Sequence, residues 1–241
     1  NRLLFSLSSI SNRISFKERS LYSSIHNFKI LDNRVVVITG ASSGIGLEYA
    51  KQLARDYHTD LLLVSNQEQE QQQVATELAA QYGVKTIALY ADLSKQNAAE
   101  ELYQYCVDNL LTVDILVNNA GVFFFNPYCE TSMKRIELML NLHMITVAKL
   151  TRLFGEQMLQ RELSAEEQAQ KICRKPRKKG YILNMSSMSA WMAMPGIQTY
   201  NATKAFIYNF SKSIWYELYP KQMHPLSPAR SQDPSQDVPR L

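Results

Sequence analysis

The chain has 241 residues, of which 46% are apolar, so it can bury a substantial core in one large or two small domains. Its 26 lysines and arginines stand against 22 acids, but six of these cations lie within residues 171–179, and the remaining 20 are outnumbered by the acids. A protein that binds nucleic acid over a broad face spreads its cations over several elements. Because the excess of positive charge here is confined to one short run, such a face is excluded. The apolar content also excludes disorder throughout the chain.

Three cysteines, Cys106, Cys129 and Cys173, stand at wide spacings without a C-x-x-C pair. An odd, scattered set fits neither a disulfide framework nor a zinc site, so we expect no metal and a reducing, cytoplasmic compartment. No stretch reaches the roughly 18 uncharged apolar residues that a membrane span needs. The sequence therefore predicts a soluble protein.

Both ends of the chain differ in composition from its middle. Residues 1–28 contain eight serines and four cations against one acid. We interpret residues 1–29 as a flexible leader in preference to an organellar transit peptide, whose composition is similar. Residues 220–241 hold five of the eight prolines and no apolar periodicity, so no packed element is expected there. The basic run 171–179 is interpreted as a solvated loop.

Between residues 34 and 219 the chain alternates between two patterns. Short apolar runs rich in β-branched residues predict strands at residues 34–39, 60–65, 85–90, 113–118 and 180–186. Amphipathic stretches predict a helix after Gly44 and further helices at residues 67–82, 95–110, 133–159 (broken near Leu140) and 200–219. This alternation predicts an α/β domain over residues 30–219, a Rossmann-like doubly wound parallel sheet between two helical layers. Ligands of such sheets bind beyond the carboxyl ends of the strands.

A glycine-rich motif, Thr39-Gly-Ala-Ser-Ser-Gly-Ile-Gly46, follows the first strand and opens a helix. Backbone N–H groups and the positive end of that helix would face an incoming pyrophosphate. A tight strand-to-helix turn without a ligand is the other interpretation of this motif alone. Its candidate cofactor-binding residues are Gly40, Ser42, Ser43, Gly44, Ile45 and Gly46.

Two further strand ends carry polar residues. The Asp92 carboxylate can cap the helix expected to start near Ser94, or it can accept the adenine amino group of a nucleotide while Leu93 packs beside the ring; taken alone, the cap is preferred. The motif at residues 118–121 can be an ordinary turn or part of the same site. Its candidate residues are Asn119, Ala120 and Gly121.

The most specific spacing joins Ser187, Tyr200 and Lys204. Tyr200-Asn-Ala-Thr-Lys204 places a phenol and an ammonium at positions i and i+4 of one helical face. An ammonium beside a phenol favours the phenolate and lowers the pKa of that phenol from about 10. Such a phenol can act as a general acid or base toward a carbonyl or an alcohol, and Ser187 can bond to the same oxygen. Alone, Tyr and Lys at this spacing are a surface pair; their convergence with the glycine loop on one sheet edge favours catalysis.

Four motifs in this order resemble the short-chain dehydrogenase/reductase family over about residues 30–219. They are residues 39–46, residues 118–121, the spacing from Ser187 to Tyr200, and Tyr200-x-x-x-Lys204. Residues 181–187 and 200–206 are similar to the branch of that family that reduces 3-oxoacyl and 3-oxo- or 17-oxosteroid substrates.

The resemblance implies an NAD(P)-dependent oxidoreductase that interconverts an alcohol and a carbonyl by hydride transfer. Tyr200 would be the general acid in reduction, and Ser187 would hold the substrate oxygen. Lys204 would favour the phenolate and bind the nicotinamide ribose, so Tyr200 and Lys204 are also cofactor-binding candidates. Asn141 matches the helix asparagine that positions a water in the family's proton relay; its other interpretation is a polar residue at a helix junction.

The end of the second strand, Val64-Ser-Asn66, bears on the choice of cofactor. An acid there would bind the ribose 2′-hydroxyl and repel a 2′-phosphate, and neither an acid nor an arginine is present. We therefore prefer NADP(H) to NAD(H), with Asn66 as the candidate contact. We expect a small apolar carbonyl or alcohol substrate. An apolar pocket wall, or else plain core, is expected from Met188, Trp191, Met192, Met194 and Ile197.

The end of the chain departs from the family pattern. The family continues with a sixth strand, a Pro-Gly turn, a substrate-covering segment and a seventh strand, and none is recognisable in residues 220–241. We therefore expect a truncated or frame-shifted end, a fold without the last strands, and a disordered tail. The fifth strand would then keep an unpaired edge that invites self-association into a homo-oligomer. The alternative function is a catalytically impaired or non-catalytic dinucleotide-binding or scaffold protein.

Overall fold

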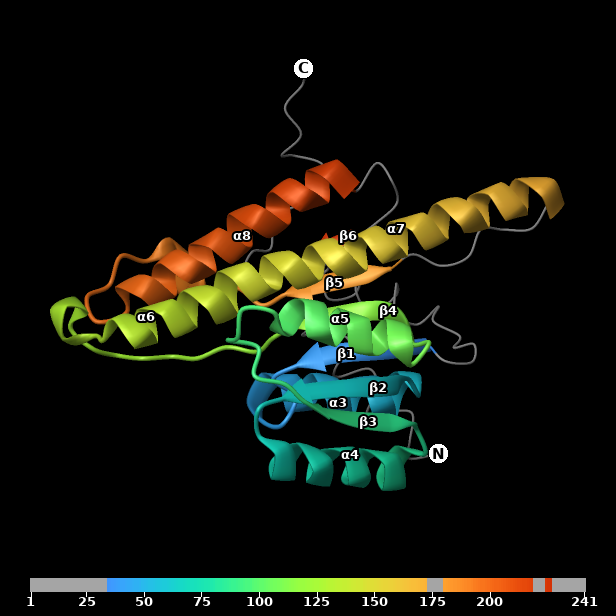
Figure 1. Ribbon diagram of the computed structural model, residues 1–241, viewed down its shortest axis with the longest axis horizontal. Coiled ribbons are helices and arrows are strands. Elements are labelled where there is room, and N and C mark those ends of the chain that lie inside the picture. The colour runs from blue at the N-terminus through green and yellow to red at the C-terminus, as the bar shows by residue number, and fades with distance from the viewer. Residues whose placement is uncertain (1–33, 173–179, 219–223, 227–241) are drawn as a thin grey trace, which may run out of the picture. The chain divides into compact units, whose positions relative to one another are not determined.

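A computed structural model describes residues 34–172, 180–218 and 224–226 of the chain. Within these residues, six strands form one parallel sheet in the order β3-β2-β1-β4-β5-β6 (Figure 1). The strands are β1 (Arg34–Thr39), β2 (Asp60–Ser65), β3 (Thr86–Tyr90), β4 (Thr112–Asn118), β5 (Tyr181–Asn184) and β6 (His224–Leu226). The order reverses its direction of growth at β1, so the predicted doubly wound sheet is confirmed.

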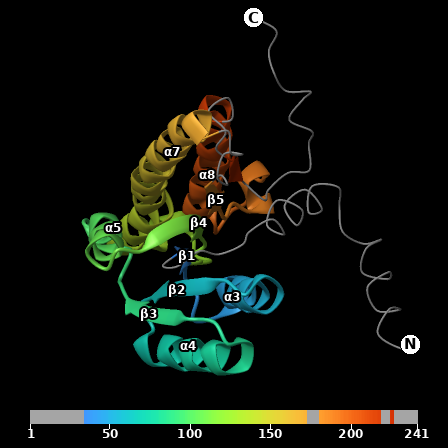
Figure 2. The same cartoon turned by 90° about the vertical axis from the view of Figure 1, so that its right-hand side faces the viewer.

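Helices cover both faces of this sheet. Helices α5 and α7 lie on one face and α3 on the other (Figure 2). Helix α8 lies on the face of α7, because Thr151 of α7 and Ser211 of α8 both bond to the Asn184 side chain, and α4 packs beside α3. Their bounds are α3 (Gly44–Tyr57), α4 (Glu68–Tyr82), α5 (Ala98–Asp108), α6 (Met133–Leu140), α7 (Thr146–Ile172) and α8 (Gln198–Leu218). The expected break near Leu140 is confirmed, because α6 ends there and a π-type turn, η2 (Asn141–Ile145), leads into α7.

The core lies between the central strands and the helices. Strands β1 and β2 are buried over all but their first residues, as continuous apolar strands covered on both faces should be. On one face, Phe154 of α7 is fully buried and meets Tyr103 of α5 edge to face, with ring centroids 5.3 Å apart. This packing holds the strands rigidly, so the loops at their carboxyl ends stand on a fixed base.

The sixth strand corrects an expectation drawn from the sequence. Strand β6 pairs with β5 in parallel register, from Tyr181 opposite His224 to Leu183 opposite Leu226. The predictions of a sheet that ends at the fifth strand, and of no packed element in residues 220–241, are therefore wrong for residues 224–226. A proline at position 225 is tolerated in this place because an edge strand has one side on which no N–H group is needed.

Other expectations concern parts of the chain that lie outside the described residues. These are the leader at residues 1–29, most of the basic run, and the tail after residue 226. Among the described residues, no helix is both long and apolar enough to cross a membrane, and no cluster of three or more His, Cys, Asp or Glu side chains could hold a metal ion. In the same residues Cys106 and Cys129 are free thiols.

A buried charge cluster stabilises the end of β4 that lies away from the glycine loop. The pairing of β1 with β4 shifts its register between Val35 and Val36, which leaves Asp114 as an extra residue in β4. This carboxylate is 1% exposed and forms ion pairs with Arg34 of β1 at 2.9 Å and Arg161 of α7 at 2.8 Å. Burial raises the pKa of the Asp114 carboxyl, and the two guanidinium groups oppose that rise.

Replacing this carboxylate should destabilise the fold. Asp114→Ala leaves two largely buried guanidinium groups without their partner, so we expect the free energy of unfolding to fall by about 3 kcal/mol. Urea denaturation measures this change. The control is Asp56→Ala, which breaks the more exposed Arg55–Asp56 pair and should cost less than about 1 kcal/mol. Equal losses in the two variants would contradict the importance of the cluster.

Candidate active site

The carboxyl ends of β1 and β4 are tied together by one threonine and one asparagine. Thr39 Oγ1 donates to the Val117 carbonyl and accepts the backbone N–H groups of Asn119 at 2.9 Å and Ala120 at 3.0 Å. The Asn119 side chain makes a second link between the two strand ends, because its Nδ2 donates to the carbonyls of Thr39 and Gly40. The two motifs predicted to share a site therefore do meet.

The glycines of the first motif serve different purposes. A Cβ atom on Gly46 would collide with the Gly40 carbonyl and with the Asn119 side chain, so only glycine lets α3 approach the loop so closely. Gly40 has a left-handed φ of +67°, and a Cβ atom at this position would lie 2.8 Å from the Ala120 backbone. A Cβ on Gly44 would meet nothing within 4 Å, although its φ is +57°. Gly44 therefore faces open space where a ligand can lie.

The first turn of α3 is suited to an anion. Ser43 is the N-cap residue, but its side chain makes no capping hydrogen bond, and the first turn holds no acid. Backbone N–H groups at this positive helix end are therefore available for phosphate oxygens. The side chain of Ile45 is 60% exposed beside them. The loop thus fits the pyrophosphate of a dinucleotide, as its sequence predicts.

The end of β2 contains a polar network that includes Ser42. The Ser42 hydroxyl lies 2.9 Å from the Ser65 hydroxyl and donates to the Gln67 side-chain carbonyl at 2.7 Å. Ser42 is itself buried, whereas Asn66 is exposed next to the network. Of these two candidates, only the exposed Asn66 could contact a nucleotide directly. The buried Ser42 instead stabilises the glycine loop through its hydrogen bonds.

At the end of β3, Asp92 caps a turn and not the predicted helix start near Ser94, because α5 begins only at Ala98 with Asn97 as its N-cap residue. Its Oδ1 accepts the Ser94 backbone N–H at 3.1 Å and the Ser94 hydroxyl at 2.6 Å. The Ser94 hydroxyl is the main cause that lowers the pKa of the Asp92 carboxyl, and Lys95 contributes to the same shift. Leu93 is buried in the core, so its side chain offers little surface to an adenine ring. The second oxygen of Asp92 lies 3.8 Å from the Lys95 ammonium.

Tyr200 and Lys204 project from the first turns of α8. The Lys204 ammonium lies 5.6 Å from the centroid of the Tyr200 ring and donates to the Met185 carbonyl at the end of β5. Lys204 is only 6% exposed, and this burial lowers its pKa from 10.5 to about 8. The turn is fixed to the same strand end, because the Ser186 hydroxyl donates to the Lys204 carbonyl at 2.8 Å. The half-buried phenol therefore stands beside an anchored ammonium.

Ser187 and Asn141 are placed less directly. The Ser187 hydroxyl accepts the Ser189 backbone N–H and lies 3.0 Å from the Ser189 hydroxyl, at the start of η3 (Met188–Trp191). Asn141 begins the π-type turn, where its carbonyl accepts the Thr146 N–H. Within the described part of the chain its side chain has no hydrogen bond. Their roles toward substrate and water remain predictions.

The buried network of Asn118 and the buried imidazole of His143 were not predicted from the sequence. Asn118 donates to the Asn184 side chain at 2.8 Å, and Asn184 donates to Ser211 of α8, which fixes α8 against β4 and β5. His143, two residues after Asn141, is fully buried between the β4 loop and α8. Neither group has a local sequence signal, because every partner comes from a distant segment.

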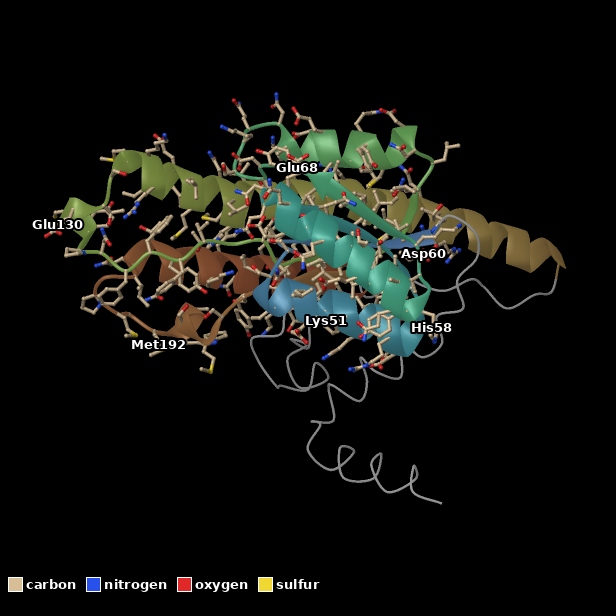
Figure 3. The ribbon with its side chains drawn as sticks, turned by 90° about the horizontal axis from the view of Figure 1, so that it is seen from below. Lys51, His58, Asp60, Glu68, Glu130 and Met192 are labelled. Carbon is tan, nitrogen blue, oxygen red and sulfur yellow. The ribbon has the colours of Figure 1, made fainter. Side chains whose placement is uncertain are left out.

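The loops after β4 and β5 form the surroundings of the phenol. The Phe123 and Tyr200 rings meet edge to face at 5.0 Å, and Asn126 donates its N–H to the Gly196 carbonyl. Figure 3 shows His58 and Asp60 at the amino end of β2, with Met192 and Glu130 at the opposite end of the molecule. The two loops thus meet beyond the carboxyl ends of the strands, as expected for a ligand site.

The apolar residues predicted as a pocket wall divide into two groups. Ile197 is buried core, whereas the other four residues, Met188, Trp191, Met192 and Met194, are exposed, Met188 most of all at 79%. Met192 and Met194 line a cavity of about 560 Å³ together with Asn201 and other residues of α8. On a helix, Asn201 lies about 100° from Tyr200, and the other α8 residues of this cavity lie farther round, so the cavity opens away from the phenol. It is not the pocket in which Tyr200 would meet a substrate.

Several known proteins are similar to this chain. It is 34% identical over 187 residues to the very-long-chain 3-oxoacyl-CoA reductase of Anas platyrhynchos, which covers 75% of this chain and 54% of the relative. It is 32% identical over 186 residues to the 17-beta-hydroxysteroid dehydrogenase type 3 of Mus musculus, again covering 75% of this chain and 54% of the relative. The chain thus spans about half the length of these curated relatives.

A solved dehydrogenase structure is similar to this fold. A short-chain dehydrogenase from Sphingobium yanoikuyae, solved in complex with NADPH, superposes with a TM-score of 0.69 at 28% identity, covering 80% of this chain and 69% of that chain. The family model for short chain dehydrogenases matches residues 34–225, from the first residue of β1 into β6. Since this match takes in nearly every described residue, the chain belongs to the short-chain dehydrogenase family.

Proposed function

We propose that the protein is an NADP(H)-dependent oxidoreductase that interconverts an apolar carbonyl compound and its alcohol, with Tyr200 as the general acid in reduction. The observation that carries this proposal is the half-buried phenol of Tyr200 beside the anchored ammonium of Lys204. This pair stands at the sheet edge where the glycine loop leaves space for a dinucleotide.

The residues at this edge fit a nicotinamide dinucleotide. The N–H groups of the first α3 turn would hold the pyrophosphate, Gly44 would face it, and Asp92 and Asn66 would lie toward the adenosine end. When bound, the nicotinamide supplies the hydride. The preference for NADP(H) is supported by the exposed amide of Asn66, which stands where an acid would repel a 2′-phosphate.

The chain's own residues supply the proton chemistry. The Tyr200 hydroxyl would donate its proton to the developing alkoxide, and the Lys204 ammonium would stabilise the phenolate that remains. Lys204 is suited to this because its ammonium is held by the Met185 carbonyl in a site from which water is largely excluded. Ser187, whose hydroxyl now accepts from Ser189, would bond to the substrate oxygen in its place.

An apolar substrate is supported by the side chains around the phenol. Phe123 and Phe125 are more than half exposed next to Tyr200 and Gly196, where an apolar molecule would cover them. The relatives named for 3-oxoacyl and hydroxysteroid compounds support the same class. We therefore propose a lipid-like ketone or 3-oxoacyl thioester as the substrate.

Removing one oxygen atom tests the role of Tyr200. Tyr200→Phe should lower the turnover of NADPH with a ketone panel by about a hundredfold or more, because it removes the proton donor. Its affinity for NADPH should change by less than about threefold, since the phenol makes few of the cofactor contacts. The matched control is Tyr208→Phe, which makes the same change two turns farther along α8, where Tyr208 packs on Trp191.

Two results would contradict the assignment. Unchanged turnover in Tyr200→Phe would mean that another group donates the proton. Saturable NADPH binding without turnover by the unaltered chain would favour the alternative function, a dinucleotide-binding or scaffold protein without catalytic activity.

A carboxylate at the end of β2 tests the cofactor preference. Asn66→Asp should weaken NADPH binding by about tenfold or more and leave NADH binding equal or stronger, because a carboxylate repels a 2′-phosphate and accepts a 2′-hydroxyl. Fluorescence titration of both cofactors measures the two affinities. The proposal fails if the unaltered chain binds NADH more tightly than NADPH.

The buried ammonium should make Lys204 costly to the fold. Lys204→Met removes that charge, so we expect turnover to be lost while the free energy of unfolding at pH 7 rises by about 1–3 kcal/mol. The pKa of Lys204 is about 8 in the folded chain, against 10.5 for an unperturbed lysine side chain. Between these values the unfolded chain holds a proton that the folded chain has released, so the unaltered protein gains stability as the pH rises. The advantage of the variant should therefore shrink between pH 8 and pH 10, and an advantage independent of pH would contradict this account.

A further inference from the structure

His143 occupies an unusual place for a histidine. It lies in the middle of the π-type turn η2, between α6 and α7, and its side chain is fully buried. A π-type turn widens the helix by one residue and is often found at functional sites. Here the widened turn brings the imidazole between the loop after β4 and the first turns of α8.

The hydrogen bonds of His143 fix its tautomer. Val122 donates its backbone N–H to His143 Nε2 at 2.9 Å, so Nε2 carries no proton. The other nitrogen, Nδ1, lies 2.9 Å from the Thr203 hydroxyl, which itself donates to the Tyr200 carbonyl at 2.8 Å. The Thr203 oxygen must therefore accept, and Nδ1 carries the proton. The result is one directed chain of hydrogen bonds from the Val122 N–H to the Tyr200 carbonyl.

The surroundings keep this imidazole neutral. Burial, and to a smaller extent the nearby Lys204 ammonium, lowers the pKa of His143 to about 3. Lys204 and Tyr200 of α8 are the charged and titratable groups that face the ring, whereas the β4 loop contributes the uncharged residues 121–125. A proton on Nε2 would also point at the Val122 N–H, and two donors would then oppose each other.

The same contacts reach the Tyr200 side chain. Its ring is met edge to face by Phe123 from the β4 loop at 5.0 Å and by His143 at 5.8 Å. The imidazole lies so close to the loop that a Cβ on Gly121 would stand 3.0 Å from Nε2. The phenol is thus held from two sides by groups whose own positions depend on the loop after β4.

We propose that His143 is a positioning residue: a neutral imidazole, protonated on Nδ1, that ties the loop after β4 to the turn of α8 and so holds the Tyr200 hydroxyl in place. The proposal rests on the proposed function of Tyr200. His143 neither donates nor accepts a proton in the reaction. It couples the position of the phenol to the loop that borders the cofactor site.

Nuclear magnetic resonance tests the tautomer without any turnover. Long-range proton–nitrogen spectra of the uniformly labelled full chain should show His143 protonated on Nδ1 and bare on Nε2, unchanged between about pH 8 and pH 5. His58, which is exposed at the end of α3, provides the comparison in the same spectra. A proton on Nε2, or protonation of both nitrogens within that range, would overturn the proposal.

Kinetics test the positioning through Thr203, whose hydroxyl can be removed without a change of shape. Thr203→Val should lower turnover by about tenfold with NADPH affinity nearly unchanged, and Thr203→Ser, which keeps the hydroxyl, should restore most of the loss. The control is Thr76→Val on α4, which removes an exposed hydroxyl that also donates to a helix carbonyl. His143→Leu, if it folds, should resemble Thr203→Val.

The outcomes separate this proposal from the proposed function. Equal losses in the Val and Ser variants, or no loss in either, would show that the hydrogen-bond chain does not position the phenol. If the unaltered chain has no turnover, the proposed function fails by itself. The Tyr200 ring resonances then test the positioning role. They should shift in Thr203→Val and return in Thr203→Ser only if the hydrogen bonds through His143 and Thr203 hold the ring in place.

Discussion

The close approach of α3 to the ends of β1 and β4 is the constraint on which the site depends. Gly46 leaves no room for a side chain against the Gly40 carbonyl, and the Asn119 side chain donates to that carbonyl and to the carbonyl of Thr39. The first turn of α3 is therefore aimed across the edge of the sheet, with its N–H groups uncapped. The proposed dinucleotide would therefore lie across this edge, and Tyr200 would face it from α8.

The repeated patterns of the sequence predicted the fold well. Strand and helix periodicity placed five of the strands and the break near Leu140, and the spacing of Tyr200 and Lys204 placed both on one face of α8. These features depend on neighbours in the sequence, which a pattern can reveal. Strand β6 was missed because three residues around a proline carry no periodicity, and its pairing with β5 is decided by tertiary structure.

The buried polar groups were missed for a related reason. Asp114 stands within an apolar run, and its partners Arg34 and Arg161 come from another strand and another helix. His143 likewise has no partner within its own turn. Such groups are costly to bury unless every partner is present, so they occur where the fold must hold one arrangement. Asp114 fixes the arrangement of the amino end of the sheet, and His143 and Lys204 fix the arrangement beside the phenol.

The most direct measurement follows the hydride itself. NADPH that carries deuterium at both C4 positions is supplied with an apolar ketone, and the alcohol is analysed by mass spectrometry. The account predicts one deuterium on the carbinol carbon of every product molecule, because the site is built to hold cofactor and substrate together. Product without deuterium, or no product from a folded chain that binds NADPH, would contradict it.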